Sequence, residues 1–253
     1  MKRENNIKKE NNTKRENNMK KENNTKRENK FKPLKLKTKR LLIETASLAE
    51  MEQLRDEAQD AERKKAYQEM IDGCQENPKQ YNWYAAWKIM DRTSGELIGE
   101  FCFKGPQKDG AVEIEYGIKP AFEKQGYMSE AVKVMCGWAT SQEDVYFIMA
   151  KTTEENAASK RVLEKNKFKP VETNGEEGLR FFLERESSVW MPIYMSFGLC
   201  IGMSLGMSQG NQSLGMCLGM SVGLAIGAAM DASDKKRRDG FRQKLGLTES
   251  KGK

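Results

Sequence analysis

Histidine is absent from the 253-residue chain. Ser-His-Asp catalysis, Cys-His catalysis and His-ligated metals are therefore excluded, and we expect no metal cofactor. The five cysteines are scattered and form no CxxC pair, and no apolar signal segment opens the chain. This combination is typical of reduced thiols in a cytoplasmic protein.

Charge is distributed unevenly along the chain. Much of the net charge of +7 comes from the two ends, so a basic nucleic-acid groove in the core is not required and nucleic acid is not favoured as a partner. Composition predicts five segments: a disordered repeat tail at 1–31, a globular α/β domain at 32–186, a linker at 187–195, a glycine-rich helical hairpin at 196–230 and a basic tail at 231–253.

The first segment repeats the units KRENNI, KKENNT, KRENNM and KKENNT. The repeat runs from Lys2 to Lys30. Its period of six keeps neither a helix face nor a strand face apolar, and Ile7 and Met19 are the apolar residues within it. Such a segment cannot bury enough surface to offset the entropy of ordering, which predicts a solvated tail. A basic arm that attracts RNA or an anionic membrane is the alternative.

The globular segment alternates between strand and helix patterns. Strand-like alternation over 34–45 leads to a helical region at 47–77, in which Ser47 and Glu50 form a capping box. Three strands beginning at Trp83 follow, then a helix, a strand, a second helix and two strands. This order predicts an α/β fold with a mixed sheet.

The loop in FEKQGYMSEAV (122–132) connects a predicted strand to a predicted helix through Gly126. A helix N-terminus offers unpaired N–H groups and a partial positive charge, and a glycine loop turns several N–H groups toward one point. The arrangement suits a phosphate, which a side chain at Gly126 would block. A plain turn residue at a strand-to-helix corner is the alternative.

A second motif, Asn-x-x-Ser-x-Arg-Val-Leu-Glu-Lys, begins at Asn156. Together with IEYGIKPAFEKQGYMSEAV and RLLIET, it resembles the GNAT superfamily of acetyl-CoA-dependent N-acetyltransferases, in particular the branch of the ribosomal-protein N-terminal acetyltransferases. The resemblance covers about residues 36–185. It implies a mixed central sheet flanked by helices, with acetyl-CoA as co-substrate.

The resemblance also implies roles for particular residues. A backbone amide of Ile118 or a neighbour would polarise the thioester carbonyl, and Asn156 would contact the pantetheine arm or cap its helix. Backbone amides of the glycine loop would bind the pyrophosphate: Lys124, Gln125, Gly126, Tyr127, Met128 and Ser129.

Four positions depart from the family pattern. Glu123 stands where Arg or Gln is usual, Met128 where Gly or Ala is usual, and Lys167 where Gly usually caps a helix. Leu163 replaces the Tyr that protonates the leaving thiolate in many relatives, so Ser159 or Tyr127 would have to substitute.

The strand AVEIEYGI would carry the general base. Alternation places Glu113, Glu115 and Gly117 on one face, and either carboxylate could take the proton of the attacking ammonium through water. A charged, solvent-facing side of the strand is an equally good interpretation.

Glycines recur every four residues from 198 to 210 and from 215 to 227. Each set forms a stripe on a helix face, which predicts two short helices packed through glycine as a glycine zipper. Each arm spans about 14–18 residues, fewer than the ~20 of a full membrane span, but Trp190, Tyr194 and the basic 235–238 suit a membrane boundary. Membrane association and self-association therefore remain open, and 231–253 is expected to be mobile.

These patterns together predict an N-acetyltransferase that moves an acetyl group from acetyl-CoA to a primary amine, either a protein N-terminus or a small molecule, by direct attack on the thioester. The alternative is a catalytically weak coenzyme A-binding module whose role is assembly or membrane association through the glycine hairpin.

Overall fold

The computed structural model describes residues 33–105, 109–171, 178–187 and 189–247. The predicted repeat tail at 1–31 lies outside the described residues. The chain divides into two compact units. The first holds the residues up to Gly105 together with Glu115–Ala131, and the second holds Pro106–Ile114 together with Val132–Lys253.

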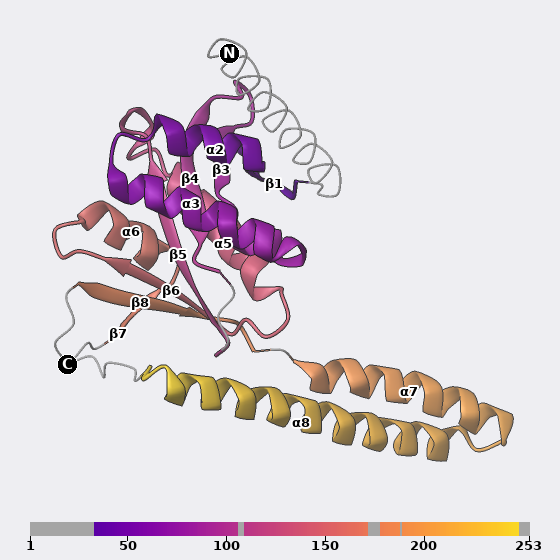
Figure 1. The fold of residues 1–253 in the computed structure, drawn as a ribbon. Coiled ribbons are helices and arrows are strands. Elements are labelled where there is room, and N and C mark those ends of the chain that lie inside the picture. Colours follow the sequence, from indigo (N-terminus) through magenta and orange to yellow (C-terminus); the bar gives the residue numbers. More distant parts are fainter. Residues whose placement is uncertain (1–32, 106–108, 172–177, 188, 248–253) are drawn as a thin grey trace, which may run out of the picture. The chain divides into compact units, whose positions relative to one another are not determined.

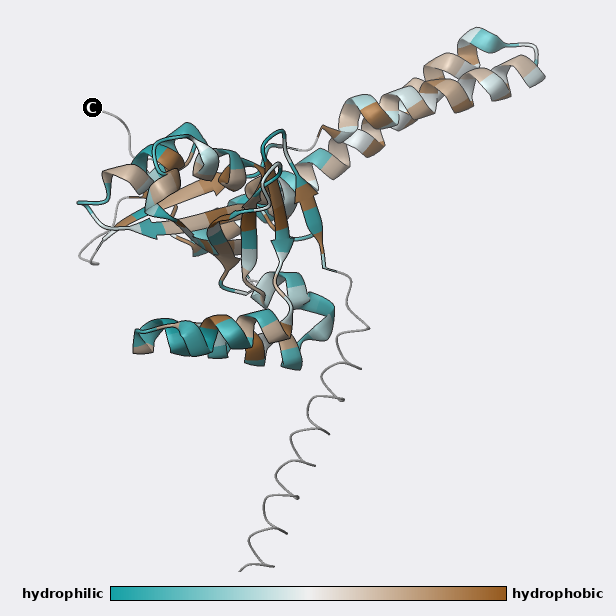
Figure 2. Cartoon of the chain, turned by 90° about the horizontal axis from the view of Figure 1, so that it is seen from above, coloured by the Kyte–Doolittle hydropathy of each residue, from teal (hydrophilic) through white to brown (hydrophobic). Residues whose placement is uncertain are grey.

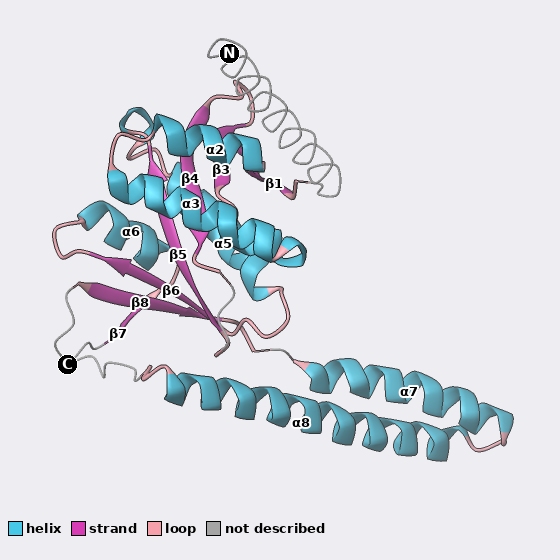
Figure 3. Cartoon of the chain, viewed as in Figure 1, coloured by secondary structure: helices cyan, strands magenta, loops and turns pink. Residues whose placement is uncertain are grey.

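The strands of the first unit form an antiparallel series. It contains β1 (Lys35–Lys37), β2 (Leu41–Thr45), β3 (Trp87–Asp91) and β4 (Leu97–Phe103), and each of the first three pairs antiparallel with the next. The second half of β5 (Ala111–Ile118) belongs to this unit as well. Figure 3 shows the strands in magenta.

Helices α2 (Leu48–Glu57) and α3 (Ala61–Glu76) cover one face of these strands (Figure 1). The capping box of α2 is confirmed, because Glu50 donates its N–H to the Ser47 hydroxyl at 3.3 Å and accepts the Ser47 N–H at 2.8 Å. A buried cluster joins the helices to the short α4 (Tyr81–Tyr84) through side chains that include Met51, Tyr67, Ile71 and Tyr81.

The second unit contains the first half of β5, β6 (Phe147–Thr152), β7 (Lys169–Val171) and β8 (Leu179–Glu184). β5 pairs parallel with β6, while β6 and β7 pair antiparallel with β8. Because β5 runs through both units, the hydrogen-bonded order is β1-β2-β3-β4-β5-β6-β8-β7. The predicted mixed α/β sheet with flanking helices is confirmed. Helix α5 (Tyr127–Thr140) follows β5, and α6 (Ala157–Lys165) follows β6.

Two boundaries differ from the predicted elements. The strand pattern at 34–45 forms two strands, because the Thr38 hydroxyl accepts the N–H groups of Arg40 at 3.2 Å and Leu41 at 2.8 Å and so closes a turn. The strand expected from Trp83 begins only at Trp87, because α4 precedes it and its Tyr81 hydroxyl donates to the carbonyl of Ala46 at 2.7 Å.

The glycine-rich segment folds as a hairpin of α7 (Trp190–Ser208) and α8 (Gln212–Lys244), which lie side by side in Figures 1 and 2. Glycines face the partner helix along the whole contact. A Cβ at Gly206 would lie 2.7 Å from the carbonyl oxygen of Asn211, and Cβ atoms at Gly202 and Gly219 would collide with backbone atoms of the other helix. Only glycine permits this approach of two helix backbones.

Both ends of the hairpin extend beyond the sequence prediction. The predicted linker at 187–195 is helical from Trp190, and the predicted mobile tail at 231–253 is helical to Lys244. For the end of α8 the reason is packing within the second unit: the centroid of the Phe241 ring lies 5.5 Å from that of the Tyr146 ring, and Leu247 is buried in the same cluster. Arg238 and Arg242 pair with the carboxylate of Glu184.

Helix α6 ends in a Schellman motif with a lysine where glycine is favoured. Phe168 N–H donates to the carbonyl of Leu163 at 3.0 Å and Lys167 N–H to that of Glu164 at 2.9 Å. Lys167 has φ of 63°, the left-handed region that costs a residue with a Cβ roughly 1 kcal/mol.

We therefore expect Lys167→Gly to raise the free energy of unfolding by about 0.5–1 kcal/mol, measured by urea denaturation of the full chain. Lys167→Ala should bring no such gain because the Cβ remains. Lys165→Gly, inside the same helix, should lower stability by about 1 kcal/mol. Equal effects of the two glycine substitutions would contradict this account.

Candidate active site

The predicted pyrophosphate loop is a tight turn ahead of α5. Lys124 and Gly126 have positive φ values of 60° and 79°, and α5 begins at Tyr127. A Cβ at residue 126 would meet an Arg40 guanidinium nitrogen at 3.8 Å, which is an ordinary contact. The left-handed backbone, rather than crowding by the chain itself, is what requires glycine here.

Arg40 braces this loop, and sequence reasoning did not single it out. Its guanidinium donates to the Gln125 carbonyl at 3.1 Å and stacks over the Tyr127 ring at 4.4 Å. The same group contacts the Glu130 carboxylate through two nitrogens, each at 2.8 Å. Since a guanidinium is planar and permanently charged, one residue fixes the loop to the first turn of α5.

The departures at Glu123 and Met128 have local explanations. Glu123 is exposed, so its carboxylate is solvated rather than turned into the loop. Met128 is 5% exposed and packs its side chain in the core, which leaves its backbone amide in the first turn of α5. Lys124 and Gln125 are exposed, whereas Tyr127 and Ser129 are half-buried.

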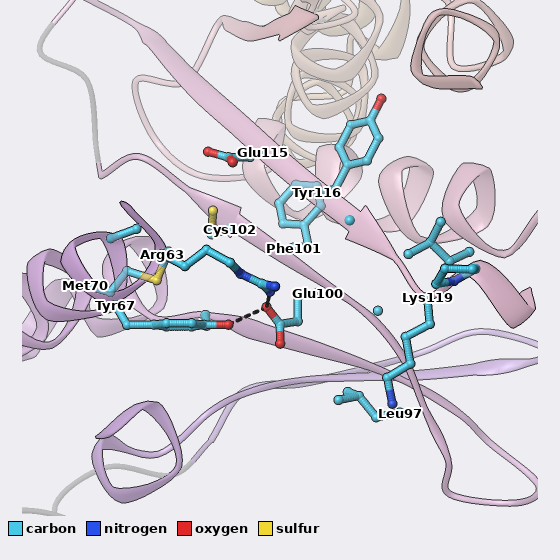
Figure 4. Close-up of a pocket in the computed structure, with 16 residues that line it drawn as sticks. Arg63, Tyr67, Met70, Leu97, Glu100, Phe101, Cys102, Glu115, Tyr116 and Lys119 are labelled. Atoms are coloured by element: carbon cyan, nitrogen blue, oxygen red, sulfur yellow. Dashed lines mark hydrogen bonds and ion pairs between the residues drawn. The ribbon is translucent and has the colours of Figure 1, made fainter. Parts of the chain in front are cut away.

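A pocket of about 580 Å³ lies in the first unit. It is bounded by α3, β4 and the second half of β5 (Figure 4), and the predicted residues Glu115 and Ile118 both line it. The Glu100 carboxylate is its most strongly bonded acidic group, since it accepts the Tyr67 hydroxyl at 2.6 Å and lies 3.6 Å from the Arg63 guanidinium. Glu100 is a candidate that the sequence analysis missed.

Burial keeps two side chains that line the pocket, Tyr67 and Cys102, in their protonated forms. Burial raises the pKa of Tyr67, and the hydrogen bond to Glu100 raises it further, so the phenol remains a donor at neutral pH. Burial also raises the pKa of Cys102 to about 12. Its thiol is therefore protonated, and Cys102 is a poor nucleophile.

The end of β5 reaches this pocket through a close backbone approach. A Cβ at Gly99 of β4 would collide with the Gly117 carbonyl oxygen and lie 3.1 Å from Cα of Ile118. Lys119 N–H donates to the carbonyl of Ile98 at 2.8 Å. Gly99 thus allows β4 and β5 to meet where Ile118 enters the pocket, whereas a Cβ at Gly117 would meet no atom within 4 Å.

The two predicted base candidates have different surroundings. Glu113, in the second unit, lies 3.5 Å from the Lys151 ammonium, and its side chain is 19% exposed. Glu115 lies 3.4 Å from the Lys104 ammonium, and its side chain is 66% exposed. Of these two carboxylates, Glu115 is the one that lines the pocket.

The second motif belongs to the second unit. Asn156 caps α6 by accepting the Ser159 N–H at 2.9 Å, so the helix-cap interpretation is confirmed. Leu163 is fully buried, and its side chain packs in the core. The structure therefore groups the predicted site residues in three places. The glycine loop contacts Arg40; Glu115 and Ile118 line one pocket; and Asn156 contacts Ser159. The roles of all these residues toward the substrates stay predictions.

Residues 32–169 match the family described as "Acetyltransferase (GNAT) domain". The match spans more than half of the chain, so the protein belongs to the GNAT acetyltransferase family, whose general reaction is acetyl transfer to an amine. The resemblance read from the loop and the Asn156 motif is confirmed.

An uncharacterized N-acetyltransferase of Bacillus subtilis (strain 168), YjdG, is 31% identical over 83 residues, which are 32% of this chain and 49% of that protein. The match thus spans about half the length of this relative. Similar solved structures include an acetyltransferase from Agrobacterium tumefaciens str. C58 (16% identity, TM-score 0.49, 61% of this chain and 96% of that one). Another is the ribosomal-protein-S5-alanine acetyltransferase from Vibrio fischeri (13% identity, TM-score 0.48, 60% of this chain and 97% of that one).

The ion pair of Arg40 and Glu130 makes a testable electrostatic contribution to the stability of the fold. Burial pushes the pKa of Glu130 up, but hydrogen bonds from Thr38 and Arg40 and the guanidinium charge outweigh it and hold the pKa below the usual value. A carboxyl whose pKa is lower in the folded chain stabilises the fold above its unfolded-state pKa, and this contribution disappears as the pH falls through the folded-state value.

We therefore expect Glu130→Gln to lower the free energy of unfolding at pH 7 by about 1 kcal/mol or less, since the pair is partly exposed and screened. The difference from the parent should shrink as the pH falls below about 4.5. Urea unfolding across pH would measure it, with the exposed Glu123→Gln in the same loop as control. A difference that persists unchanged at low pH would rule out the ion pair as its source.

Proposed function

We propose that the protein transfers the acetyl group of acetyl-CoA directly to a primary amine bound in the pocket beside β5. The observation that carries this proposal is the position of Glu100, Glu115 and Ile118 around one cavity in a member of the GNAT family. Two carboxylates attract an ammonium group, and a backbone N–H beside them can polarise a carbonyl. The acceptor is a protein N-terminus or a small-molecule amine.

In the proposed reaction the amine first loses a proton, and Glu115 accepts it through water. Glu115 fits this role because it lines the pocket and its side chain is accessible to water. Glu100 already accepts the Tyr67 hydroxyl, so it is assigned to binding the ammonium rather than to taking its proton. Glu113 lies near Lys151 and remains the alternative base.

The neutral amine then attacks the thioester carbonyl carbon. A carbon–nitrogen bond forms, the carbon–sulfur bond breaks, and the N–H of Ile118 or a neighbour stabilises the oxyanion. The leaving thiolate takes a proton from Ser159, with Tyr127 as the alternative donor, and the proton that the new amide nitrogen loses restores this donor. Neither side chain is a strong acid, so protonation of the thiolate is the step for which the site offers the least help.

Acetyl-CoA is assigned to the loop ahead of α5 and to the start of α6. Amides of Lys124, Gln125, Gly126 and the first turn of α5 would bind the pyrophosphate, supported by the positive end of the helix. Asn156 would contact the pantetheine arm in addition to its role as helix cap. The positive φ of Gly126 supports this assignment, because left-handed residues in a tight turn are typical of loops that turn successive N–H groups toward an anion.

The second candidate function is a coenzyme A-binding module with little or no turnover. The complete burial of Leu163, where many relatives have an acidic Tyr, is the observation that favours it. Binding of acetyl-CoA by the full chain without release of free thiol, across peptide and small-molecule amines, would select this candidate over the enzyme.

Gly126→Glu should abolish acetyl-CoA binding by the full chain, measured by isothermal titration, because it strains the loop and adds a negative charge beside the pyrophosphate. Gly137→Glu is the control: Gly137 lies exposed on α5, the helix that follows the loop, and a Cβ there would meet no atom within 4 Å. This control should keep the parent affinity. An unchanged affinity in Gly126→Glu would show that the loop does not bind the pyrophosphate.

Glu115→Gln should lower kcat/KM by about 100-fold, with activity recovering at alkaline pH as the amine loses its proton to solvent. Glu100→Gln should chiefly raise the KM for the amine, because an ammonium loses a charged partner. Glu113→Gln serves as control and should stay within about threefold of the parent. If Glu113→Gln loses activity while Glu115→Gln keeps it, the assignment of the base is reversed.

A further inference from the structure

The glycine hairpin has its small residues inside and its large apolar residues outside. Gly202 and Gly206 of α7 and Gly223 and Gly227 of α8 are the buried residues of the two helices. The large hydrophobic side chains that are exposed in the described part of the chain all lie within 189–230. A helix pair that folds in water places such side chains in its interior, so this hairpin is built for apolar surroundings.

No Asp, Glu, Lys or Arg occurs between Trp190 and Met230. Helix α7 has 19 residues, and the charge-free part of α8 runs from Gln212 to Met230. At 1.5 Å per residue each spans about 28 Å, close to the ~30 Å hydrocarbon core of a bilayer. Both arms are longer than the roughly 14–18 residues expected from the sequence, since α7 already begins at Trp190. The argument that the arms are too short to span a membrane therefore no longer holds.

The polar groups of the hairpin are arranged for a medium without water. The hydroxyls of Ser196, Ser204 and Ser221 donate to the carbonyls four residues earlier, at 2.7–3.0 Å, so each is satisfied within its own helix. The first amides of α7 are satisfied as well: Trp190 N–H and Met191 N–H donate to the Asp231 carboxylate at 2.8 and 3.1 Å.

The two ends of the hairpin differ in charge. The tip, Gln209-Gly210-Asn211-Gln212, is polar but uncharged (Figure 2), whereas the base carries Asp231 and the basic 235–238. Arg237 and Arg238 pair with acidic residues of the second unit, while Lys235 and Lys236 are exposed. An uncharged tip crosses a bilayer readily, and basic residues stay on the cytoplasmic side near anionic headgroups.

We propose that α7 and the charge-free part of α8 insert into a lipid bilayer as a helical hairpin, with both ends on the cytoplasmic side and the tip at the opposite surface. By length and composition each helix could cross a membrane, and 11% of the most apolar stretch of each is buried within the protein. The glycine contacts hold the two helices together, and the outward side chains face lipid. The proposal is independent of the acetyl-transfer chemistry.

Vesicle flotation tests insertion. The full chain should float with vesicles of phosphatidylethanolamine and phosphatidylglycerol, and about 1 M salt should not release it, because that salt screens attraction by basic residues alone. The double variant Ile201→Asp and Leu218→Asp should reduce flotation at least about tenfold. Both positions point outward, with side chains 60% and 58% exposed, so helicity by circular dichroism should be kept.

Ile201→Met and Leu218→Met at the same positions are the matched control and should float like the parent. Release by salt, or undiminished flotation of the double Asp variant, would overturn the proposal in favour of surface attraction. Saturable dimerisation of the lipid-free chain, with no flotation, would instead assign the apolar surface to a second copy.

Cysteine labelling tests topology in intact bacterial cells that express the full chain. A membrane-impermeant maleimide should label Asn211→Cys at the tip but label Asp239→Cys only after lysis. Cys200 and Cys217 are exposed on the helices and should be protected in membranes but labelled in sodium dodecyl sulfate. A tip cysteine that is labelled only after lysis would show that the hairpin does not cross the bilayer and would overturn the proposed topology.

Discussion

The backbone of β5 is the constraint on which the candidate active site depends. Its first half pairs in parallel with β6, in register from Ala111 with Phe147 to Ile114 with Ala150, and buried side chains fix that register. Beyond Ile114 the same strand supplies Glu115, Gly117 and Ile118 to the pocket. Because the backbone is continuous, a strand anchored in a core presents a carboxylate and amides at a set spacing, which a loop could not do as accurately.

Glycine serves three distinct physical purposes in this chain. At Gly126 it permits a left-handed backbone, at Gly99 it permits two strands to approach, and in the hairpin it permits two helices to pack backbone to backbone. Only the third purpose has a period, so the sequence pattern showed it as a repeat. At the other two positions, the neighbouring motif or the three-dimensional contact is needed to distinguish glycine with a function from an ordinary turn.

Local and periodic features were predictable from the sequence, and long-range pairings were not. The Ser47 capping box, the Asn156 cap and the glycine hairpin depend on residues within a few positions or on a regular spacing, and the structure contains all three. Arg40 and Glu130 are 90 residues apart, and Tyr67 and Glu100 are 33 apart. No short pattern marks such pairs, because either partner alone is an ordinary charged or aromatic residue.

The helical end of α8 shows how tertiary packing overrides composition. Residues 231–244 are rich in Lys, Arg and Asp and on composition alone suggest a solvated tail. Phe241 and Leu247 nevertheless pack against Tyr146 and its neighbours, which adds apolar burial to the ion pairs on Glu184.

Because α8 is one continuous helix, this packing fixes the direction of its charge-free part. Asp231 is the first residue of the charged part that follows. The acidic side chain stands where the sequence of the helix changes from charge-free to charged, and it also accepts the first amides of α7. The same residue therefore closes the base of the hairpin and sets the limit of its apolar surface.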